Sequence, residues 1–226
     1  MRGVGRAVFM STILLMMTFT QIDYSEHNEL SFTNPSSSLS YSDLGYRMSP
    51  VGVGNNLFFS ADDGINGYEL WKSDGTSLGT VMVKDISSGS DESLPFWFTA
   101  VGSTVYFSAD TIANGRELWK TDGTEAGTVM VKDIRTGLGN SYPNDLTAVG
   151  NTLFFQAWDS SNGKELWKSD GTSSGTVMVK DIRSGSSSGT PSYLTAVGST
   201  LFFQANDGTT GNELWKSGVY TDVFYS

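Results

Sequence analysis

A 48-residue period is the feature of this sequence that most constrains its fold. Four tryptophans follow one another at that interval, and so do four glycines that each end a Val-Gly pair. A fixed period of this length is typical of stacked supersecondary units that bury apolar surface against their neighbours. Because no copy gains or loses a residue between these landmarks, we expect the same backbone in every unit. The landmarks are Trp71, Trp119, Trp167 and Trp215, and Gly54, Gly102, Gly150 and Gly198.

Each unit contains four short segments of strand-like sequence, separated by turn residues. In the third unit, Gly150 and Asn151 indicate a two-residue hairpin turn, because both tolerate a positive φ. The loops WDSSNG and DGTSSG separate the remaining segments. We therefore predict an antiparallel meander of four strands in each unit. In the third unit, the strands are expected at 146–149, 152–157, 164–169 and 176–182.

The apolar residues of these strands point to both faces of the predicted sheet. In the segment 152–157, Leu153 and Phe155 share one face and Phe154 lies on the other. A strand with this pattern is buried on both faces, and four-stranded sheets packed around an axis provide that environment. The sequence thus predicts an all-β fold: a β-propeller-like array of four four-stranded antiparallel blades.

The repeated phrase also predicts which residues face one another across strands. If Ser169 pairs with Thr176, then Trp167 lies opposite Met178 and Glu165 lies opposite Lys180. The same register predicts the pairs Glu69–Lys84 and Glu117–Lys132. Opposite charges directly across two strands stabilise a sheet by about 0.2–1 kcal/mol. The Asp-Gly pairs that follow are explained as turns, in which the carboxylate accepts a hydrogen bond from the backbone two residues on.

At these residues the chain resembles the ELWxxDGT repeat family. The phrase reads ELWKSDGT from Glu69, ELWKTDGT from Glu117 and ELWKSDGT from Glu165, whereas the copy from Glu213 diverges after Ser217. The resemblance implies a secreted or surface-exposed prokaryotic repeat protein of propeller-like fold, with no established catalysis. It brings no functional residues to this chain.

The N-terminal part of the chain differs from the repeats. Arg2 and Arg6 precede an apolar run at 7–19, which is the pattern of a signal peptide. That run is shorter than the roughly 20 residues that a membrane-spanning helix needs. We interpret 1–20 as a signal-like segment, 21–47 as a Ser-rich linker and 48–226 as the four-repeat domain. A secreted or cell-surface location follows, with membrane attachment only if the first segment stays uncleaved.

Composition and motifs argue against several classes of function. The formal charge of −10 argues against a nucleic-acid partner, and the absence of cysteine excludes thiolate metal sites. Asp62, Asp63 and Asn66 invite a calcium hypothesis, but Thr111 stands where other copies have Asp, so turn chemistry is the preferred explanation. The only histidine, His27, lies in the linker. We therefore predict no enzyme activity, no catalytic residues, no metal site and no cofactor.

Binding residues are expected where the copies differ. The connection before each first strand varies most, and loops between blades gather on one face of a propeller. Aromatic side chains near Asp and Asn suit sugars or peptides. The candidate ligand-binding residues are Trp97, Tyr142, Trp158 and Tyr193.

These observations predict a non-catalytic extracellular scaffold, adhesion or binding module whose partner is an extracellular protein or a glycan. A lectin-like propeller is the first alternative, and a glycan-cleaving hydrolase is the second. The last blade needs a fourth strand. A tight turn at Ser217 and Gly218 would set Glu213 against Asp222, so we expect a longer loop, a tail that pairs elsewhere, or completion by residues 40–44. An unclosed ring would expose a strand edge and favour self-association.

Overall fold

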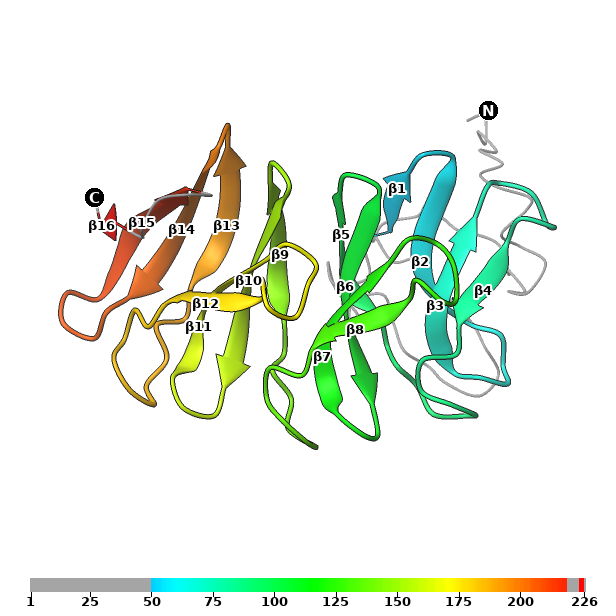
Figure 1. The fold of residues 1–226 in the computed structure, drawn as a ribbon, viewed down its shortest axis with the longest axis horizontal. Coiled ribbons are helices and arrows are strands. Elements are labelled where there is room, and N and C mark those ends of the chain that lie inside the picture. Colours follow the sequence, from blue (N-terminus) through cyan, green and yellow to red (C-terminus); the bar gives the residue numbers. More distant parts are fainter. Residues whose placement is uncertain (1–49, 219–223, 226) are drawn as a thin grey trace, which may run out of the picture.

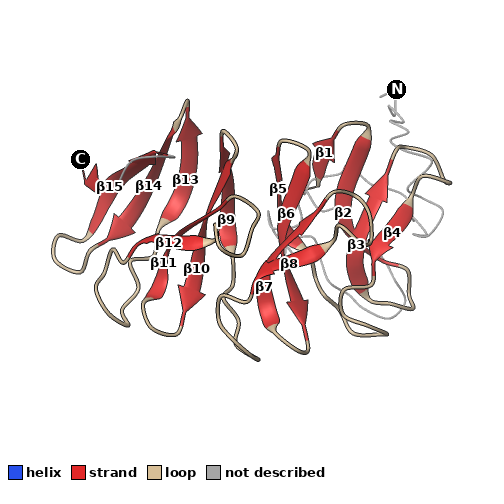
Figure 2. Cartoon of the chain, in the orientation of Figure 1, coloured by secondary structure: helices blue, strands red, loops and turns tan. Residues whose placement is uncertain are grey.

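The computed structural model describes residues 50–218 and 224–225, which form four antiparallel sheets of four strands each (Figures 1 and 2). Within each sheet the strands follow chain order, so each unit is the predicted meander, or blade. The all-β fold is confirmed. The strands are β1 (Val51–Val53), β2 (Asn56–Asp62), β3 (Tyr68–Ser73), β4 (Val81–Lys84), β5 (Phe96–Val101), β6 (Thr104–Thr111), β7 (Gly115–Thr121), β8 (Val129–Lys132), β9 (Asn144–Val149), β10 (Thr152–Asp159), β11 (Gly163–Ser169), β12 (Val177–Lys180), β13 (Ser192–Val197), β14 (Thr200–Asn206), β15 (Asn212–Gly218) and β16 (Phe224–Tyr225).

The fourth strand of each blade is shorter than the sequence predicted. In the third blade, β12 ends at Lys180, two residues before the predicted end. The backbone N–H of Ile182 donates to the carboxylate of Glu165 at 3.0 Å, so the chain leaves the sheet at this point. The hairpin turn at Gly150 and Asn151 is confirmed, because Val149 pairs with Thr152.

The predicted Trp–Met pairs are confirmed, but the predicted Glu–Lys pairs are wrong. Trp167 lies opposite Met178, whereas Lys180 lies opposite Leu166. The pairing register shifts by one residue between Leu166 and Trp167, so the Trp–Met pair forms as predicted and the Glu–Lys pair does not. The same shift recurs in the first two blades. The glutamate is therefore left to bind the connection that follows the sheet.

The four blades follow one another along the long axis of the molecule, with the first and last at opposite ends (Figure 1). The first strands are neighbours: β1 contacts β5, β5 contacts β9, and β9 contacts β13. This arrangement is that of consecutive propeller blades, in which the first strands lie innermost. The array is an open arc rather than a closed ring.

The last blade obtains its fourth strand through a longer loop. In β16, Tyr225 pairs with Trp215 and Phe224 with Lys216. The tight turn that would oppose Glu213 and Asp222 is therefore wrong. The predicted signal-like segment 1–20, the predicted linker 21–47 and the candidate strand 40–44 lie outside the described residues.

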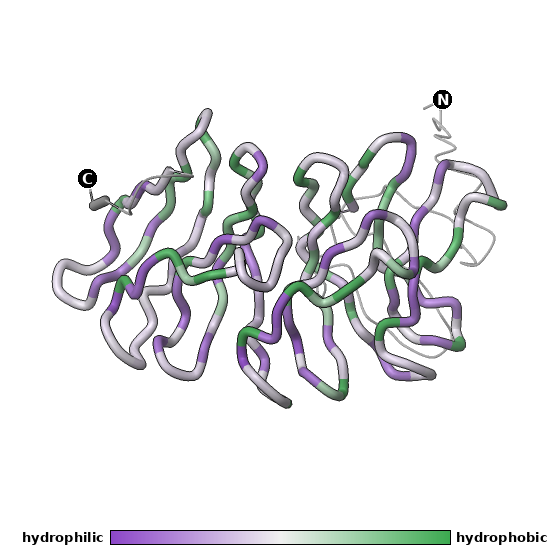
Figure 3. The backbone as a smooth tube through the Cα atoms, in the orientation of Figure 1, coloured by the Kyte–Doolittle hydropathy of each residue, from purple (hydrophilic) through white to green (hydrophobic). Residues whose placement is uncertain are grey.

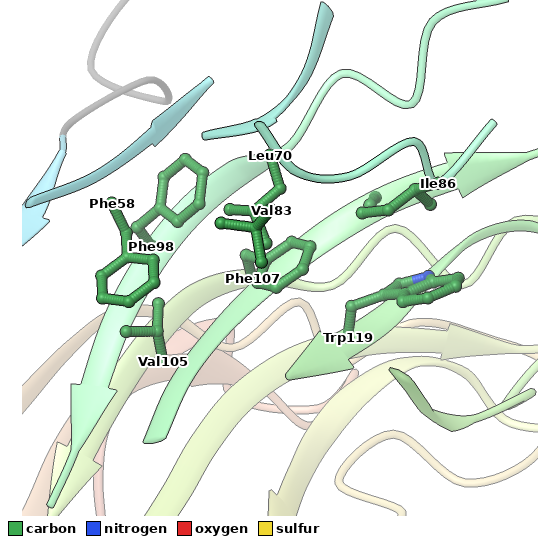
Figure 4. Close-up of a cluster of buried hydrophobic side chains, with 9 residues drawn as sticks. Phe58, Leu70, Val83, Ile86, Phe98, Val105, Phe107 and Trp119 are labelled. Carbon is green, nitrogen blue, oxygen red and sulfur yellow. The ribbon is translucent and has the colours of Figure 1, made fainter. Parts of the chain in front are cut away.

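Three apolar clusters hold the blades together, one at each junction. Apolar residues are spread along the strands of every blade (Figure 3). Consecutive apolar residues reach opposite junctions, since Phe154 belongs to the cluster between the third and fourth blades and Phe155 to the cluster between the second and third. At the first junction, Phe58 and Leu70 of the first blade meet Phe107 and Trp119 of the second (Figure 4). The burial of both faces that the sequence predicted is thus confirmed in the inner blades. The described residues contain no helix long and apolar enough to cross a membrane.

Candidate functional site

The connections between blades adopt a left-handed backbone at two positions each. Among the described residues, only these positions combine a positive φ with a residue other than glycine. Such a conformation costs about 1–3 kcal/mol and is found often at binding sites. Because the left-handed conformation recurs at the 48-residue period, it is also part of the repeated fold. The first position is held by Leu94, Tyr142 and Thr190, and the second by Trp97, Asp145 and Tyr193.

The structure brings two of the predicted aromatic residues together at the junction of the second and third blades. The backbone N–H of Trp158 donates to the carbonyl of Ser141 at 2.8 Å, so Trp158 lies beside the residue that precedes Tyr142. Tyr142 is 44% exposed, and its hydroxyl accepts a hydrogen bond from the Asn140 amide at 3.1 Å. We call Arg135, Asn140, Tyr142 and Trp158 the junction site.

Arg135 completes the junction site from the same connection. Its guanidinium carbon lies 3.8 Å from the centroid of the Trp158 ring, which is a cation–π contact. The side chain also donates to the carbonyl of Asn140 at 3.5 Å. In the described part of the chain, no carboxylate lies within 4.0 Å of this guanidinium. The site therefore offers a cation, an amide and a phenol around aromatic surface.

The other two predicted aromatics, Trp97 and Tyr193, lie apart from the junction site in a row of equivalent positions. Trp97 packs against the apolar cluster between the second and third blades, whereas Tyr193 is 77% exposed. The backbone N–H of Tyr193 donates to Asp145 Oδ2 at 3.1 Å. Partial burial raises the pKa of Asp145, although this hydrogen bond opposes the shift. The four predicted residues therefore form two groups rather than one.

Sequence reasoning missed Arg135, Asn140 and Asp145. The signal for Asn140 and Asp145 was available, because both lie in one of the connections that vary most between the copies. Arg135 was harder to find, because its place beside Trp158 depends on how the connection folds back over the end of β10.

The glutamates of the repeated phrase have raised pKa values, but their hydrogen bonds serve the fold. Glu117 is fully buried and accepts hydrogen bonds from the backbone of Ile134, Arg135 and Ser141 and from the Ser141 hydroxyl. Burial raises the pKa of Glu117 to about 7 in spite of these hydrogen bonds. Glu165 is held in the same way, with its pKa also raised by burial to about 7. Each glutamate thus fastens the connection that leaves its own blade.

The aspartates of the loops serve the turns that contain them. Asp122 Oδ1 accepts hydrogen bonds from the backbone and hydroxyl of Thr124, and the hydroxyl bond is the larger cause of its lowered pKa. The predicted turn chemistry is therefore confirmed. Asp63, in the loop that suggested calcium, accepts from Ile65 and from both nitrogens of Asn66.

The sequence matches no protein-family model and no curated protein. Solved structures resemble its fold at low identity. A mutant of puromycin hydrolase complexed with PGG gives a TM-score of 0.53 at 14% identity, over 78% of this chain and 28% of that protein. A structure from an analysis of two prolyl endopeptidases gives a TM-score of 0.50 at 14% identity, over 76% of this chain and 24% of that protein. This chain thus spans about a quarter of each. The matching parts are β-propeller domains, so the fold is that of part of a β-propeller.

Proposed function

We propose that this chain is a non-catalytic, extracellular binding module that takes its ligand at the junction site. The observation that carries the proposal is the combination of Arg135 and Tyr142, from the second connection, with Trp158 of β10, which does not recur at the equivalent positions of the neighbouring repeats. Residues shared by all blades serve packing and turns, whereas this combination is not shared by the other blades. Aromatic surface with a few fixed polar groups is typical of ligand sites.

An extracellular location and membership of the ELWxxDGT repeat family belong to the same proposal. The signal-like segment with Arg2 and Arg6 supports export, and the repeated phrase supports the family. The absence of catalysis is supported by the place of the glutamates. Glu117 and Glu165 have the pKa values that acid–base chemistry needs, but both are fully buried and bound to backbone N–H groups.

A carbohydrate is the favoured ligand class among the alternatives, which makes the protein lectin-like. Tyr142 presents an exposed ring beside the amide of Asn140, and Arg135 adds a cation that suits a carboxylate-bearing sugar. A peptide with an acidic group is the competing ligand.

Binding of the full-length chain to a glycan array and to a peptide array tests the proposal. We expect Tyr142→Ala to weaken binding at least about ten-fold, the loss of one good contact. Leu138→Ala is the matched control, because Leu138 is exposed in the same connection. Binding unchanged by Tyr142→Ala rejects the junction site, and binding on neither array rejects the binding module. Glycan hydrolysis that one carboxylate substitution abolishes would establish an enzyme instead.

A further inference from the structure

The junction site stands on a connection that one buried carboxyl group holds at both ends. Glu117 of β7 is fully buried. Its Oε1 accepts hydrogen bonds from the backbone N–H groups of Arg135 at 3.3 Å and Ser141 at 3.2 Å. Its Oε2 accepts from the Ser141 hydroxyl at 2.6 Å. Because Arg135 belongs to the site and Ser141 directly precedes Tyr142, Glu117 fixes the backbone at both of these ligand-binding positions.

The stretch between these two ends is held by hydrogen bonds rather than by apolar packing. Ile134 belongs to the apolar cluster between the second and third blades, but no residue of 135–141 does. Residues 136–138 are exposed. Asn140 Oδ1 accepts from the backbone N–H of Arg116 at 2.7 Å. A segment with few buried apolar contacts can open locally while the sheets stay folded.

The surroundings of Glu117 disfavour its ionised form. Among the described residues, no Lys or Arg nitrogen lies within 4.0 Å of its carboxyl group. Burial raises its pKa to about 7 in spite of the hydrogen bonds that it accepts, and the like charge of Asp133 adds to the rise. The cations nearby in the sequence or on the adjoining blade bind elsewhere: Lys84 and Lys132 donate to the carbonyls of Thr128 and Thr176, Arg116 donates to those of Ser93 and Leu94, and Arg135 stacks on Trp158.

We propose that the junction site is assembled while Glu117 carries its proton and comes apart, by local opening of residues 135–142, when that proton is lost. Opening lets water reach the carboxylate, and it separates Arg135 from Trp158. The inference rests on the proposed function and adds to it that pH regulates binding at the site.

The direction of this regulation follows from linkage between protonation and opening. The pKa of Glu117 is about 7 in the closed connection, whereas a hydrated carboxyl group has the ordinary value of 4.5. The closed form therefore binds more protons than the open form. Its advantage is complete below pH 4.5 and is lost as pH rises through 7, so we expect the site to be formed in acid and opened in mild alkali.

Amide hydrogen exchange of the full-length chain, followed by NMR between pH 5 and pH 8, tests the proposal. The N–H groups of Arg135 and Ser141 report the opening once each rate is divided by the intrinsic rate at the same pH. Their protection is expected to fall roughly 50- to 100-fold across this range. At pH 8 both are expected to be less protected than amides of β6 such as that of Phe107, because the opening is local.

Glu117→Gln cannot titrate, so it is expected to flatten the pH dependence at Arg135 and Ser141. The third connection provides the matched control in the same sample. The N–H of Gly189 donates to Glu165 at 2.7 Å, and its pH dependence is expected to persist in this variant. A pH dependence at Ser141 that survives Glu117→Gln, or protection equal to that of Phe107, would overturn the proposal.

A carbon-13 NMR titration of the Glu117 carboxyl group in the wild type gives a readout that needs no variant to fold. Its midpoint is expected well above 4.5, and an ordinary midpoint would also overturn the proposal. All of these measurements are made without ligand. A failure of the arrays to show binding is therefore distinct from a failure of the connection to open.

Discussion

At the scale of the residue, a single buried glutamate fixes each connection between blades. Glu117 is the clearest example, because its carboxylate accepts from the beginning of the connection at Ile134 and from its end at Ser141. In the third blade Gly189 replaces that serine, and Glu165 keeps only backbone donors. The glutamate of the repeated motif therefore accepts hydrogen bonds from backbone N–H groups of the connection that would pair with a neighbouring strand in a regular sheet.

Removal of the Glu117 carboxylate is expected to destabilise the protein strongly. Glu117→Ala leaves several buried N–H groups without an acceptor, and each costs about 1–3 kcal/mol. We expect the free energy of unfolding in urea to fall by at least about 3 kcal/mol. Glu125→Ala is the control, because Glu125 is exposed in a loop of the same blade. Equal losses in the two variants would contradict a role for the buried carboxylate.

Because of these carboxyl groups, we expect the free energy of unfolding to fall as pH rises from about 4.5 to about 7. Burial raises the pKa of Glu117 and Glu165 from 4.5 to about 7, and raises that of Glu69. The folded state therefore binds more protons than the unfolded state in this window, so its advantage is complete below 4.5 and lost above 7.

Urea unfolding at a series of pH values measures this dependence. The free energy of unfolding is expected to be higher near pH 5 than near pH 8, by a few kcal/mol. Glu117→Gln cannot titrate, so its profile is expected to be shallower. A wild-type stability that rises across the window would show that the carboxylates stay ionised in the folded protein.

At the scale of the element, the connections are as regular as the strands. Each connection uses two left-handed residues and returns to the start of the third strand of the blade it leaves. The N–H of Ser141, for example, donates to the carbonyl of Arg116 at 3.0 Å. The close approach explains why glycine begins β7, since a Cβ at Gly115 would lie 2.6 Å from the carbonyl oxygen of Gly139.

Two alanine substitutions separate crowding from backbone strain in this element. Both Gly115 and Gly137 have a positive φ, but a Cβ at Gly137 would meet nothing within 4 Å. We expect Gly137→Ala to cost about 1–2 kcal/mol from the left-handed backbone alone. Gly115→Ala adds overpacking and is expected to cost about 2–5 kcal/mol. Thermal unfolding of the two variants gives the comparison, and equal losses would exclude the crowding.

At the scale of the whole molecule, a blade is buried on both faces only where it has a neighbour on each side. Val149 of the third blade is 1% exposed, whereas the equivalent Val197 of the fourth blade is 59% exposed. Leu166 is fully buried, whereas the equivalent Leu214 is 54% exposed. Each blade therefore depends on its neighbours for part of its burial, as in other repeat architectures.

The sequence by itself determined the repeat, the four strands of each blade, the hairpin turns and the Trp–Met pairs. These features are local or recur in phase, so alternation and turn residues such as Gly150 and Asn151 were sufficient to predict them. It also identified the variable connections, one of which contains Arg135, Asn140 and Tyr142.

Only the tertiary structure decided where the charged residues of the motif bind. A one-residue register shift moved Lys180 opposite Leu166 and released Glu165 to the next connection, and the sequence carries no signal for such a shift. The grouping of Arg135 with Trp158, and the exposure of Val197 against the burial of Val149, likewise depend on which surface lies next to which. Identical local sequences have different environments because burial is set by the neighbouring blade.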